Sequence, residues 1–154
     1  MAVTLVIPGK LPINLMGGET AGETRKVDWL SDSFKAALFT ASHTPAQDTD
    51  ELYASLTNEV ANGNGYTTGG NALANPSVAY SAGSNLSTFD MDNPALWTAS
   101  GAGFAFRYVW AYDVTTDLLL GYLDYGSTVT LSGANGDTFA LTIDVLGLIT
   151  ASVP

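Results

Sequence analysis

Five aromatic residues alternate with small or aliphatic ones in the stretch GFAFRYVWAY at 103–112, and this alternation constrains the fold most. The rings fall on every second position: Phe104, Phe106, Tyr108, Trp110 and Tyr112. Successive side chains of a β-strand point to opposite faces, so the pattern predicts a strand with all five rings on one face. Soluble monomers rarely expose so large an apolar patch. We therefore expect most of this face to be core, on the inner side of a central strand; a subunit interface or an open ligand platform are the alternatives.

Similar short patterns, separated by turn signals, predict a mainly β fold. Residues 33–41 form a strand in which Phe34, Ala36 and Leu38 face one way. Lys35, Ala37 and Phe39 then face the other way. Further strands are predicted at 77–81, 86–90, 95–99, 103–113, 117–124, 127–131, 137–144 and 146–150. This spacing in a chain of 154 residues predicts a single domain, a β-sandwich or jelly roll.

One short helix is expected among these strands, at 48–60 (DTDELYASLTNEV). Asp48 or Thr49 is a suitable N-cap, and acidic residues crowd the first turn, where the helix dipole favours them. The following segment, NGNGYTTGG at 62–70, predicts a glycine-rich loop with a type I′ turn at an Asn-Gly step. Tyr66 inside this loop is expected either to pack down as an anchor or to project as a contact.

Residues 1–26 predict an extended N-terminal arm that precedes a β-sandwich domain at 27–154. VTLVIP is compatible with one short strand, and the rest is rich in glycine and proline without a sustained period. One interpretation is a loose chain end. The other is an arm that docks its apolar residues on a neighbouring chain. Those residues are Val3, Leu5, Ile7, Leu11, Ile13 and Leu15.

The charge distribution argues against nucleic-acid binding. Five basic residues stand against fifteen acidic ones, a net charge of −10, and after Lys35 the only cation is Arg107. Nucleic-acid binding depends on many Lys and Arg residues that neutralise phosphates. We expect Arg107 to tie the sheet to a loop through Asp90, Asp92 or Asp124, and it is the strand residue we would place first at a subunit interface. No apolar run approaches the ~18 residues that span a bilayer, so no membrane partner is expected.

No residue pattern predicts catalysis, a cofactor or a metal. The single histidine, His43, precedes Thr44-Pro45 in a turn and is expected to be solvated rather than to act as a base. The AYSAG stretch at 79–83 lacks the leading glycine of a nucleophile elbow. The loop at 63–69 lacks the lysine of a phosphate-binding loop.

Carboxylate groups leave two weaker alternatives. Asp113, Asp117 and Asp124 lie near one another in sequence, but nothing fixes them at the ~5–9 Å separation of a glycosidase pair. Asp90, Asp92 and Asn93 offer oxygen ligands suited to calcium, although the spacing fails that of a calcium-binding helix–loop–helix. An improvised calcium site near Asp90 and Asp92 stays open.

Several motifs resemble small virion proteins of tailed bacteriophages. Residues 32–73 carry the forms "K-x-A-L-x-T", "TP-x-QDTDE", "NEV" and "GYT-x-GG" of that family. In the second half, Trp97-Thr98-Ala99, Phe106-Arg107-Tyr108 and LLLGYLDYG at 118–126 are similar to its "W-x-A", "A-R-Y" and "L-x-G-Y-x-D-F-G". The chain departs from the family at Phe106, where a small residue more often precedes the arginine.

The resemblance implies a non-enzymatic virion protein, and a capsid decoration (cement) protein in particular. Such a protein would form a homotrimer on the outer capsid surface and hold the major capsid protein together. The arm residues, Tyr66 and Arg107 would then contribute to the interface with the capsid or with other subunits. Alternatives are a head-fibre, neck or tail component, or a carbohydrate-binding module of a receptor-binding apparatus that uses exposed Trp or Tyr side chains.

Overall fold

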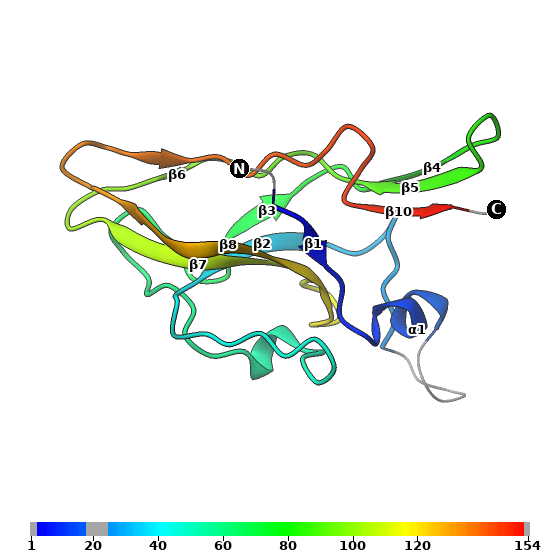
Figure 1. Cartoon of the computed structure of the whole chain (residues 1–154), viewed down its shortest axis with the longest axis horizontal. Coiled ribbons are helices and arrows are strands. Elements are labelled where there is room, and N and C mark those ends of the chain that lie inside the picture. Colours follow the sequence, from blue (N-terminus) through cyan, green and yellow to red (C-terminus); the bar gives the residue numbers. More distant parts are fainter. Residues whose placement is uncertain (1–2, 18–24, 153–154) are drawn as a thin grey trace.

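Antiparallel strands make up most of the regular structure (Figure 1). The computed structural model describes residues 3–17 and 25–152. Parts of the predicted arm, residues 1–2 and 18–24, lie outside this range, as do residues 153–154 of the predicted domain. The strands are β1 (Leu5–Val6), β2 (Phe34–Phe39), β3 (Asn71–Leu73), β4 (Ser77–Ser81), β5 (Leu86–Asp90), β6 (Trp97–Thr98), β7 (Phe104–Asp113), β8 (Leu119–Leu131), β9 (Thr138–Phe139) and β10 (Ile149–Ser152). The helices are α1 (Leu11–Met16) and the 3₁₀ turn η1 (Tyr53–Ser55).

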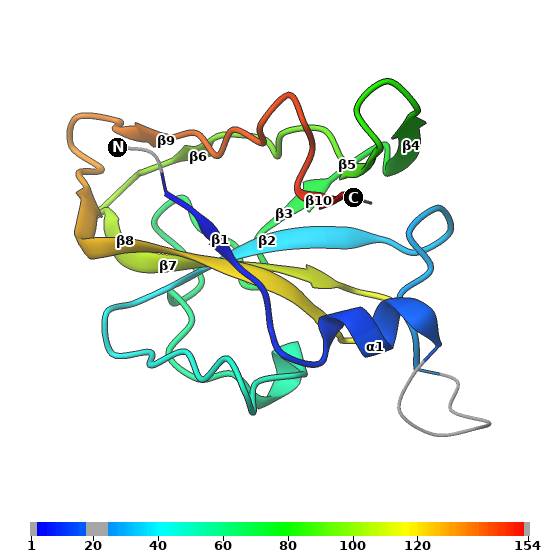
Figure 2. The ribbon, with the colours of Figure 1, turned by 45° about the vertical axis from the view of Figure 1, so that its right-hand side comes forward.

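Three antiparallel sheets form two layers. The main sheet has the order β1-β8-β7-β2-β3, and the smaller sheets have the orders β10-β5-β4 and β6-β9. Figures 1 and 2 show the smaller sheets on one side of the main sheet, with the segment that carries η1 on the other. The fold is therefore mainly β and consistent with a β-sandwich, as the strand pattern predicts.

The main sheet is apolar on both faces, because each face has its own cover. On β2, Phe34 and Leu38 lie in the large core beneath the smaller sheets, whereas Phe39 lies in a second cluster against Tyr53 and Leu56. This is the alternation predicted for residues 33–41. The segment at 40–60 thus has a packing role, because it keeps water from the second face.

The five rings of β7 do not share one face, contrary to the prediction. Phe104 and Phe106 belong to the large core, but Tyr108, Trp110 and Tyr112 belong to the second cluster. The register between β7 and β8 shifts at this point: Phe106 pairs with Val129, and Tyr108 pairs with Asp124. Such a β-bulge breaks the period of two, so the rings after it point to the other side. The expectation that the rings are core rather than an open platform is confirmed, because four of them are buried and Phe104 is half-buried.

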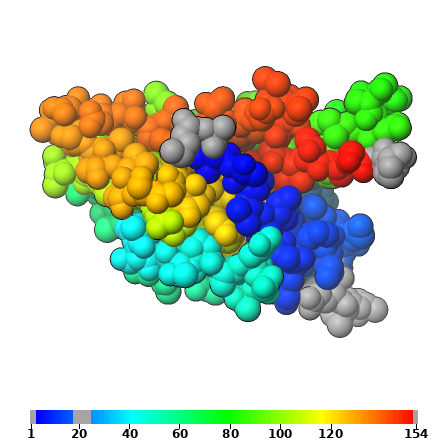
Figure 3. Space-filling model, in the orientation of Figure 1, coloured from blue at the N-terminus to red at the C-terminus, as the bar shows by residue number. Residues whose placement is uncertain are grey.

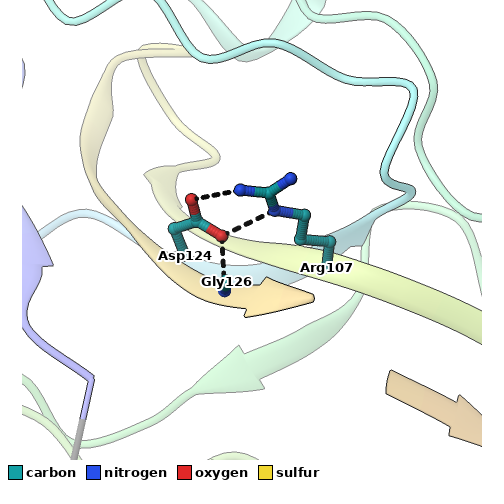
Figure 4. Close-up of polar contacts among 3 residues, drawn as sticks. All are labelled: Arg107, Asp124 and Gly126. Carbon is teal, nitrogen blue, oxygen red and sulfur yellow. Dashed lines mark hydrogen bonds and ion pairs between the residues drawn. The ribbon is translucent and has the colours of Figure 1, made fainter. Parts of the chain in front are cut away.

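An ion pair lies across the bulge (Figure 4). The Arg107 Nε donates to Asp124 Oδ1 at 2.8 Å, and its second guanidinium nitrogen donates to Asp124 Oδ2 at 2.9 Å. The Gly126 N–H also donates to Asp124 Oδ1, at 2.7 Å. Gly126 has φ +73, a left-handed conformation that glycine adopts without strain. The predicted strands at 117–124 and 127–131 are consequently one strand, β8, with Gly126 at the bend between them.

The predicted helix at 48–60 is wrong, and only the three residues of η1 are helical there. Its acidic side chains bond elsewhere instead of capping a first turn: Asp50 accepts from the Ala46 N–H, and Glu51 accepts from Lys10 Nζ. Leu52 forms a single β-bridge with Leu118, just before β8, and Glu59 forms one with Phe39 of β2. Tertiary pairing therefore overrides the local helix signal.

The one regular α-helix of the described residues lies in the predicted extended arm. α1 has Pro12 in its first turn, where the missing N–H costs nothing, and ends at Gly17 with φ +116. Its Leu11 is buried in the large core. The described part of the arm is therefore integrated into the domain of its own chain.

Gly70 tests how tightly the segment after residue 60 packs on β2. A Cβ at Gly70 would lie 1.9 Å from the Ala36 carbonyl oxygen, and the residue has φ +70. We expect Gly70→Ala to lower the free energy of unfolding by about 2 kcal/mol or more, from overpacking together with backbone strain. Chemical denaturation measures this. Gly136→Ala is the matched control, because Gly136 has φ +63 and nothing within 4 Å of its Cβ position. Equal losses in the two variants would contradict the close packing.

Candidate functional site

The sequence-predicted interface residues do not form one surface in a single copy. Leu5 pairs with Leu123 on β8, and Leu11 is buried in the core. Val3 is half-buried beside a cavity of about 590 Å³ between the layers. Ile7 and Leu15 line a groove beside α1. Ile13, at 41% exposure, is the arm residue of this set that stays on the outside.

The arm is held on its own chain by polar contacts with the QDTDE stretch. Gln47 Nε2 donates to the Ile7 carbonyl at 2.8 Å, and the Gly9 N–H donates to the Gln47 carbonyl at 3.0 Å. Glu51 accepts from Lys10 Nζ at 3.0 Å and from Asn14 Nδ2 at 3.4 Å. These contacts give the QDTDE stretch a structural role within its own chain.

Tyr66 packs down as an anchor and is 2% exposed, so its predicted place at an interface is not available in this conformation. Its turn is the predicted type I′ geometry: Gly63 and Tyr66 exchange two backbone hydrogen bonds, and Asn64 and Gly65 both have positive φ. The Tyr66 hydroxyl donates to Glu59 Oε1 at 2.6 Å and accepts from the Leu38 N–H at 3.0 Å. The loop is thereby fixed to the middle of β2.

Glu59 is the centre of this network and was missed from the sequence. Besides Tyr66, its carboxylate accepts from the Tyr53 hydroxyl at 2.5 Å and from the Gly69 N–H at 2.7 Å. Burial, followed by the bond to Glu59, raises the pKa of both Tyr53 and Tyr66, so the two phenols stay protonated as donors. The motifs NEV and GYTTGG supply the acceptor and two of the donors, a pairing that sequence spacing alone does not reveal.

Tyr112 extends the hydrogen-bond network of Glu59 to β7, on the same face of the main sheet. Its ring stacks on Tyr53 with centroids 4.0 Å apart and planes 6° apart, and its hydroxyl donates to the Gly69 carbonyl at 2.9 Å. Burial raises the pKa of Tyr112 to about 12, with Glu59 adding to the shift. The Tyr112 hydroxyl therefore stays protonated in this range and acts as a hydrogen-bond donor to Gly69.

His43 is buried at 4% exposure, which overturns the prediction of a solvated turn histidine. Trp110 Nε1 lies 2.9 Å from His43 Nε2, and His43 Nδ1 lies 3.0 Å from the Thr57 carbonyl. Indole is only a donor, so Nε2 must accept and Nδ1 must carry the proton that it donates to Thr57. Burial lowers the pKa of His43, although the bond to Thr57 and the charge of Asp50 oppose the shift. The ring is a buried connector between segment 40–60 and β7.

Arg107 pairs with Asp124, one of its three predicted partners, and its side chain keeps 31% exposure. The bond to Asp124 raises the pKa of Arg107, and the same bond lowers the pKa of Asp124. The guanidinium also lies 4.9 Å from the ring centre of Tyr108. The predicted partner Asp124 is confirmed, but the pair joins β7 to β8 rather than the sheet to a loop. A contact of Arg107 with another subunit remains a prediction.

The other carboxylates that sequence analysis raised have structural partners. Asp113 is fully buried and accepts from Thr115 and Thr116, while Asp117 accepts from the Ala54 N–H. Burial raises the pKa of Asp113 to about 6, against the lowering effect of the Thr116 bond. Asp90 accepts from the Met91 N–H, and Asp92 from Asn75 Nδ2. Over residues 3–17 and 25–152, no group of three or more His, Cys, Asp or Glu side chains is placed to hold a metal ion.

The surface that stands out lies on the projecting sheet β10-β5-β4, and the sequence patterns did not single it out. Val78, Phe89 and Ile149 are paired across the three strands and line a groove of about 700 Å³ together with α1. Tyr80 is two residues along β4 from Val78, on the same face, and is 60% exposed. We call this surface the apolar groove. Figure 3 shows the sheet overhanging the blue segment that contains α1.

The rim of the apolar groove remains largely open in a single copy. Leu30 is 66% exposed and Met16 is 87% exposed. Every residue of β4 is exposed as well. A contiguous open apolar surface of this kind is typical of a site that binds another protein. The alternation of Val78 and Tyr80 in SVAYS is the only sequence signal that points to it.

Comparisons with protein-family models, with curated proteins and with solved structures found no match to this chain. Among the described residues, no helix has the length and apolar character needed to cross a membrane.

Glu59 provides a direct test of the network. Glu59→Ala removes the acceptor of three donors and leaves the buried Tyr66 hydroxyl without it, so we expect a loss of about 3 kcal/mol in the free energy of unfolding. Urea denaturation followed by tryptophan fluorescence measures the loss. Tyr53→Phe removes one donor to the same carboxylate and should cost about 1 kcal/mol. If Glu59→Ala is no more destabilising than Tyr53→Phe, the carboxylate does not have this central role.

Because burial lowers the pKa of His43, we expect the free energy of unfolding to fall in acid. Its folded pKa lies below the value of about 6.5 in the unfolded chain, so the unfolded chain binds the extra proton first. Stability from this residue is complete above pH 6.5 and falls as pH drops below it towards the folded pKa, with a slope of at most about 1.4 kcal/mol per pH unit. Thermal or urea unfolding between pH 7.5 and 5 measures the slope.

The control for this experiment is His43→Gln, whose amide can accept from Trp110 and donate to Thr57 without titrating. Asp113 acts in the opposite sense, because a pKa raised to about 6 means that its contribution falls as pH rises from about 4 to 6. The difference between the wild-type and His43→Gln curves cancels this contribution. Parallel curves would show that His43 is not the acid-sensitive group.

Proposed function

We propose that this protein is a non-enzymatic structural protein of a tailed-bacteriophage virion, a decoration (cement) protein that binds the major capsid protein on the outer shell surface. The observation that carries the proposal is the apolar groove. A single copy leaves Leu30, Met16 and Tyr80 open to water, although the main sheet is covered on both faces. A chain with this surface is suited to work in an assembly.

The use of the polar side chains supports the same proposal. His43, Glu59 and the pair of Arg107 with Asp124 are each engaged in contacts that join segments of the fold. The motifs that resemble the phage virion proteins supply several of these contacts, so the resemblance is one of structural framework. The net charge of −10 suits a body that faces solvent on a particle.

The mechanism we propose is reinforcement by repetition. Each copy contributes a modest binding free energy, and symmetry repeats that contribution over the whole shell, where it opposes the outward pressure of packaged DNA. The proposed homotrimer multiplies the contacts of each unit. A head-fibre, neck or tail role would use the same surfaces on another part of the virion.

The carbohydrate-binding alternative has less support from the geometry. Trp29, Trp97 and Trp110 are all buried, so none of them offers an open ring to a sugar. Among the large apolar side chains that the described residues expose, Tyr80 is the aromatic one.

Binding to shells tests the proposal. Expanded capsids of the encoding phage that lack this protein should bind it at micromolar concentration or below, saturably, as measured by co-sedimentation. Capsids already filled with the protein are the control and should bind no more. Absence of saturable binding to the empty shells would overturn the capsid role.

Ile13 tests the part of the arm that remains outside. Ile13→Asp should weaken shell binding at least tenfold, because Ile13 is the exposed apolar side chain of the predicted arm contact and is outside the apolar groove. Leu96→Asp is the matched control. Leu96 lies just before β6, is 58% exposed and is far from α1 in sequence. Equal binding by both variants would remove the arm from the capsid contact.

A further inference from the structure

We propose that the apolar groove receives the turn at 144–147 of a second copy of this chain. The inference rests on the proposed function, which calls for an assembly of copies, and deepens it by naming the two surfaces that meet. Its evidence is the shape and chemistry of those two surfaces.

The turn at 144–147 is an apolar projection braced by hydrogen bonds within the turn. Val145 is 96% exposed and Leu146 is 56% exposed, at the tip of a turn where polar residues are usual. The Gly147 N–H donates to the Asp144 carbonyl at 2.8 Å, and the Leu146 N–H donates to Asp144 Oδ1 at 2.9 Å. These bonds hold the two apolar side chains outward before any partner arrives, which lowers the entropic cost of binding.

The base of this turn is fixed to the body. The Leu148 N–H donates to the Phe89 carbonyl at 2.9 Å, and a Cβ at Gly147, which has φ +92, would lie 2.8 Å from the same oxygen. The turn therefore stands on β5 through a close backbone contact. Val145 and Leu146 stand on this support and remain exposed in a single copy.

The apolar groove offers a complementary receptor. Its floor is built from buried side chains, Leu11 and Trp29 among them, and its volume of about 700 Å³ is in the range of sites that enclose small ligands or a few side chains. Its rim includes the exposed side chains of Val78 and Leu30. Two aliphatic side chains on a narrow turn match such a site in size and in chemistry.

Charge favours this pairing over two grooves face to face. The groove rim carries Lys26, next to Arg25, and both are exposed. Asp28 is an acidic residue on the same rim and offsets one of these cations, and its Oδ1 accepts from the Leu30 N–H. The turn carries Asp144, and the chain from residue 36 onward has eleven acidic residues against one cation. Lys26 on the rim of one copy would thus lie near Asp144 of the next copy, an attraction between opposite charges.

The two surfaces lie on opposite sides of the projecting sheet. In Figures 1 and 2 the loop before β10 rises on one side of this sheet, whereas α1 lies on the other. A chain cannot insert the turn into its own groove in this arrangement, so the contact joins two copies head to tail. Such a heterologous contact closes into a ring when its rotation allows, which is compatible with a trimer.

A complementation experiment tests this inference. Leu146→Asp disables the turn, and Val78→Asp disables the groove. Each variant alone should sediment as a monomer at a concentration where the wild type is oligomeric. Mixed in equal amounts, they should form a heterodimer of twice the monomer mass, because one intact turn and one intact groove remain. Leu96→Asp, the matched control, should assemble like the wild type.

One further measurement checks that the variants are folded, and another tests the contribution of the Asp144 charge. Circular dichroism and thermal melts within a few degrees of the wild type show that each variant is folded. Asp144→Asn keeps the turn acceptor but removes the charge, and should weaken association about threefold or more at low salt and less at high salt.

A wild-type chain that stays monomeric at high micromolar concentration would overturn the inference, as would an oligomer that both Leu146→Asp and Val78→Asp leave intact. A mixture that fails to complement would also overturn it, since that points to a contact between like surfaces. If the wild type is monomeric yet binds shells and Val78→Asp abolishes that binding, the groove takes a capsid segment instead. In that case the inference fails and the proposed function stands. Oligomers that do not bind shells would instead support the inference and overturn the proposed capsid role.

Discussion

The carboxylate of Glu59 is the contact on which the second face of the main sheet depends. It accepts from two tyrosine hydroxyls and from a backbone N–H, and through them it holds the chain between residues 53 and 70 against β2. The aromatic cluster of Trp110, Phe39 and Tyr108 is covered because this segment stays in place. A charged acceptor with three donors is stronger than neutral bonds of the same number, which suits a loop with little helix or strand of its own.

Local patterns predicted β2, β4, β5 and β7 well and failed where distant partners decide the structure. They missed β3, and the strands expected at 95–99 and 137–144 are only the two-residue strands β6 and β9. The alternation of Phe34, Leu38 and Phe39 gave the two faces of β2, because a straight strand keeps its period. The same reasoning failed on β7, since the bulge opposite Gly126 shifts the faces and is caused by its pairing with β8. The acidic residues at 48–51 are a valid helix start in isolation, yet in the fold they bind the arm and its neighbours.

The candidate sites show the same limit. Sequence reasoning named Asp124 among three candidate partners of Arg107, because a lone cation in an acidic chain is expected to pair with a carboxylate. It placed His43 in water, because the Thr44-Pro45 turn carries no sign of Trp110, which is 67 residues away. It also missed the apolar groove, since that surface joins α1 to strands more than sixty residues later in the chain. Surfaces of this kind arise from packing and have no contiguous motif.

The hairpin of β4 and β5 projects from the body, and its turn at 82–85 is exposed throughout. A Cβ at Gly83 would meet nothing within 4 Å, and the turn carries none of the contacts that hold the core together. Exposed tips of this sort accept inserted sequence with little effect on folding. A foreign peptide placed between Gly83 and Ser84 would stand clear of the domain, which makes this turn a natural position for peptide display on whatever assembly the protein joins.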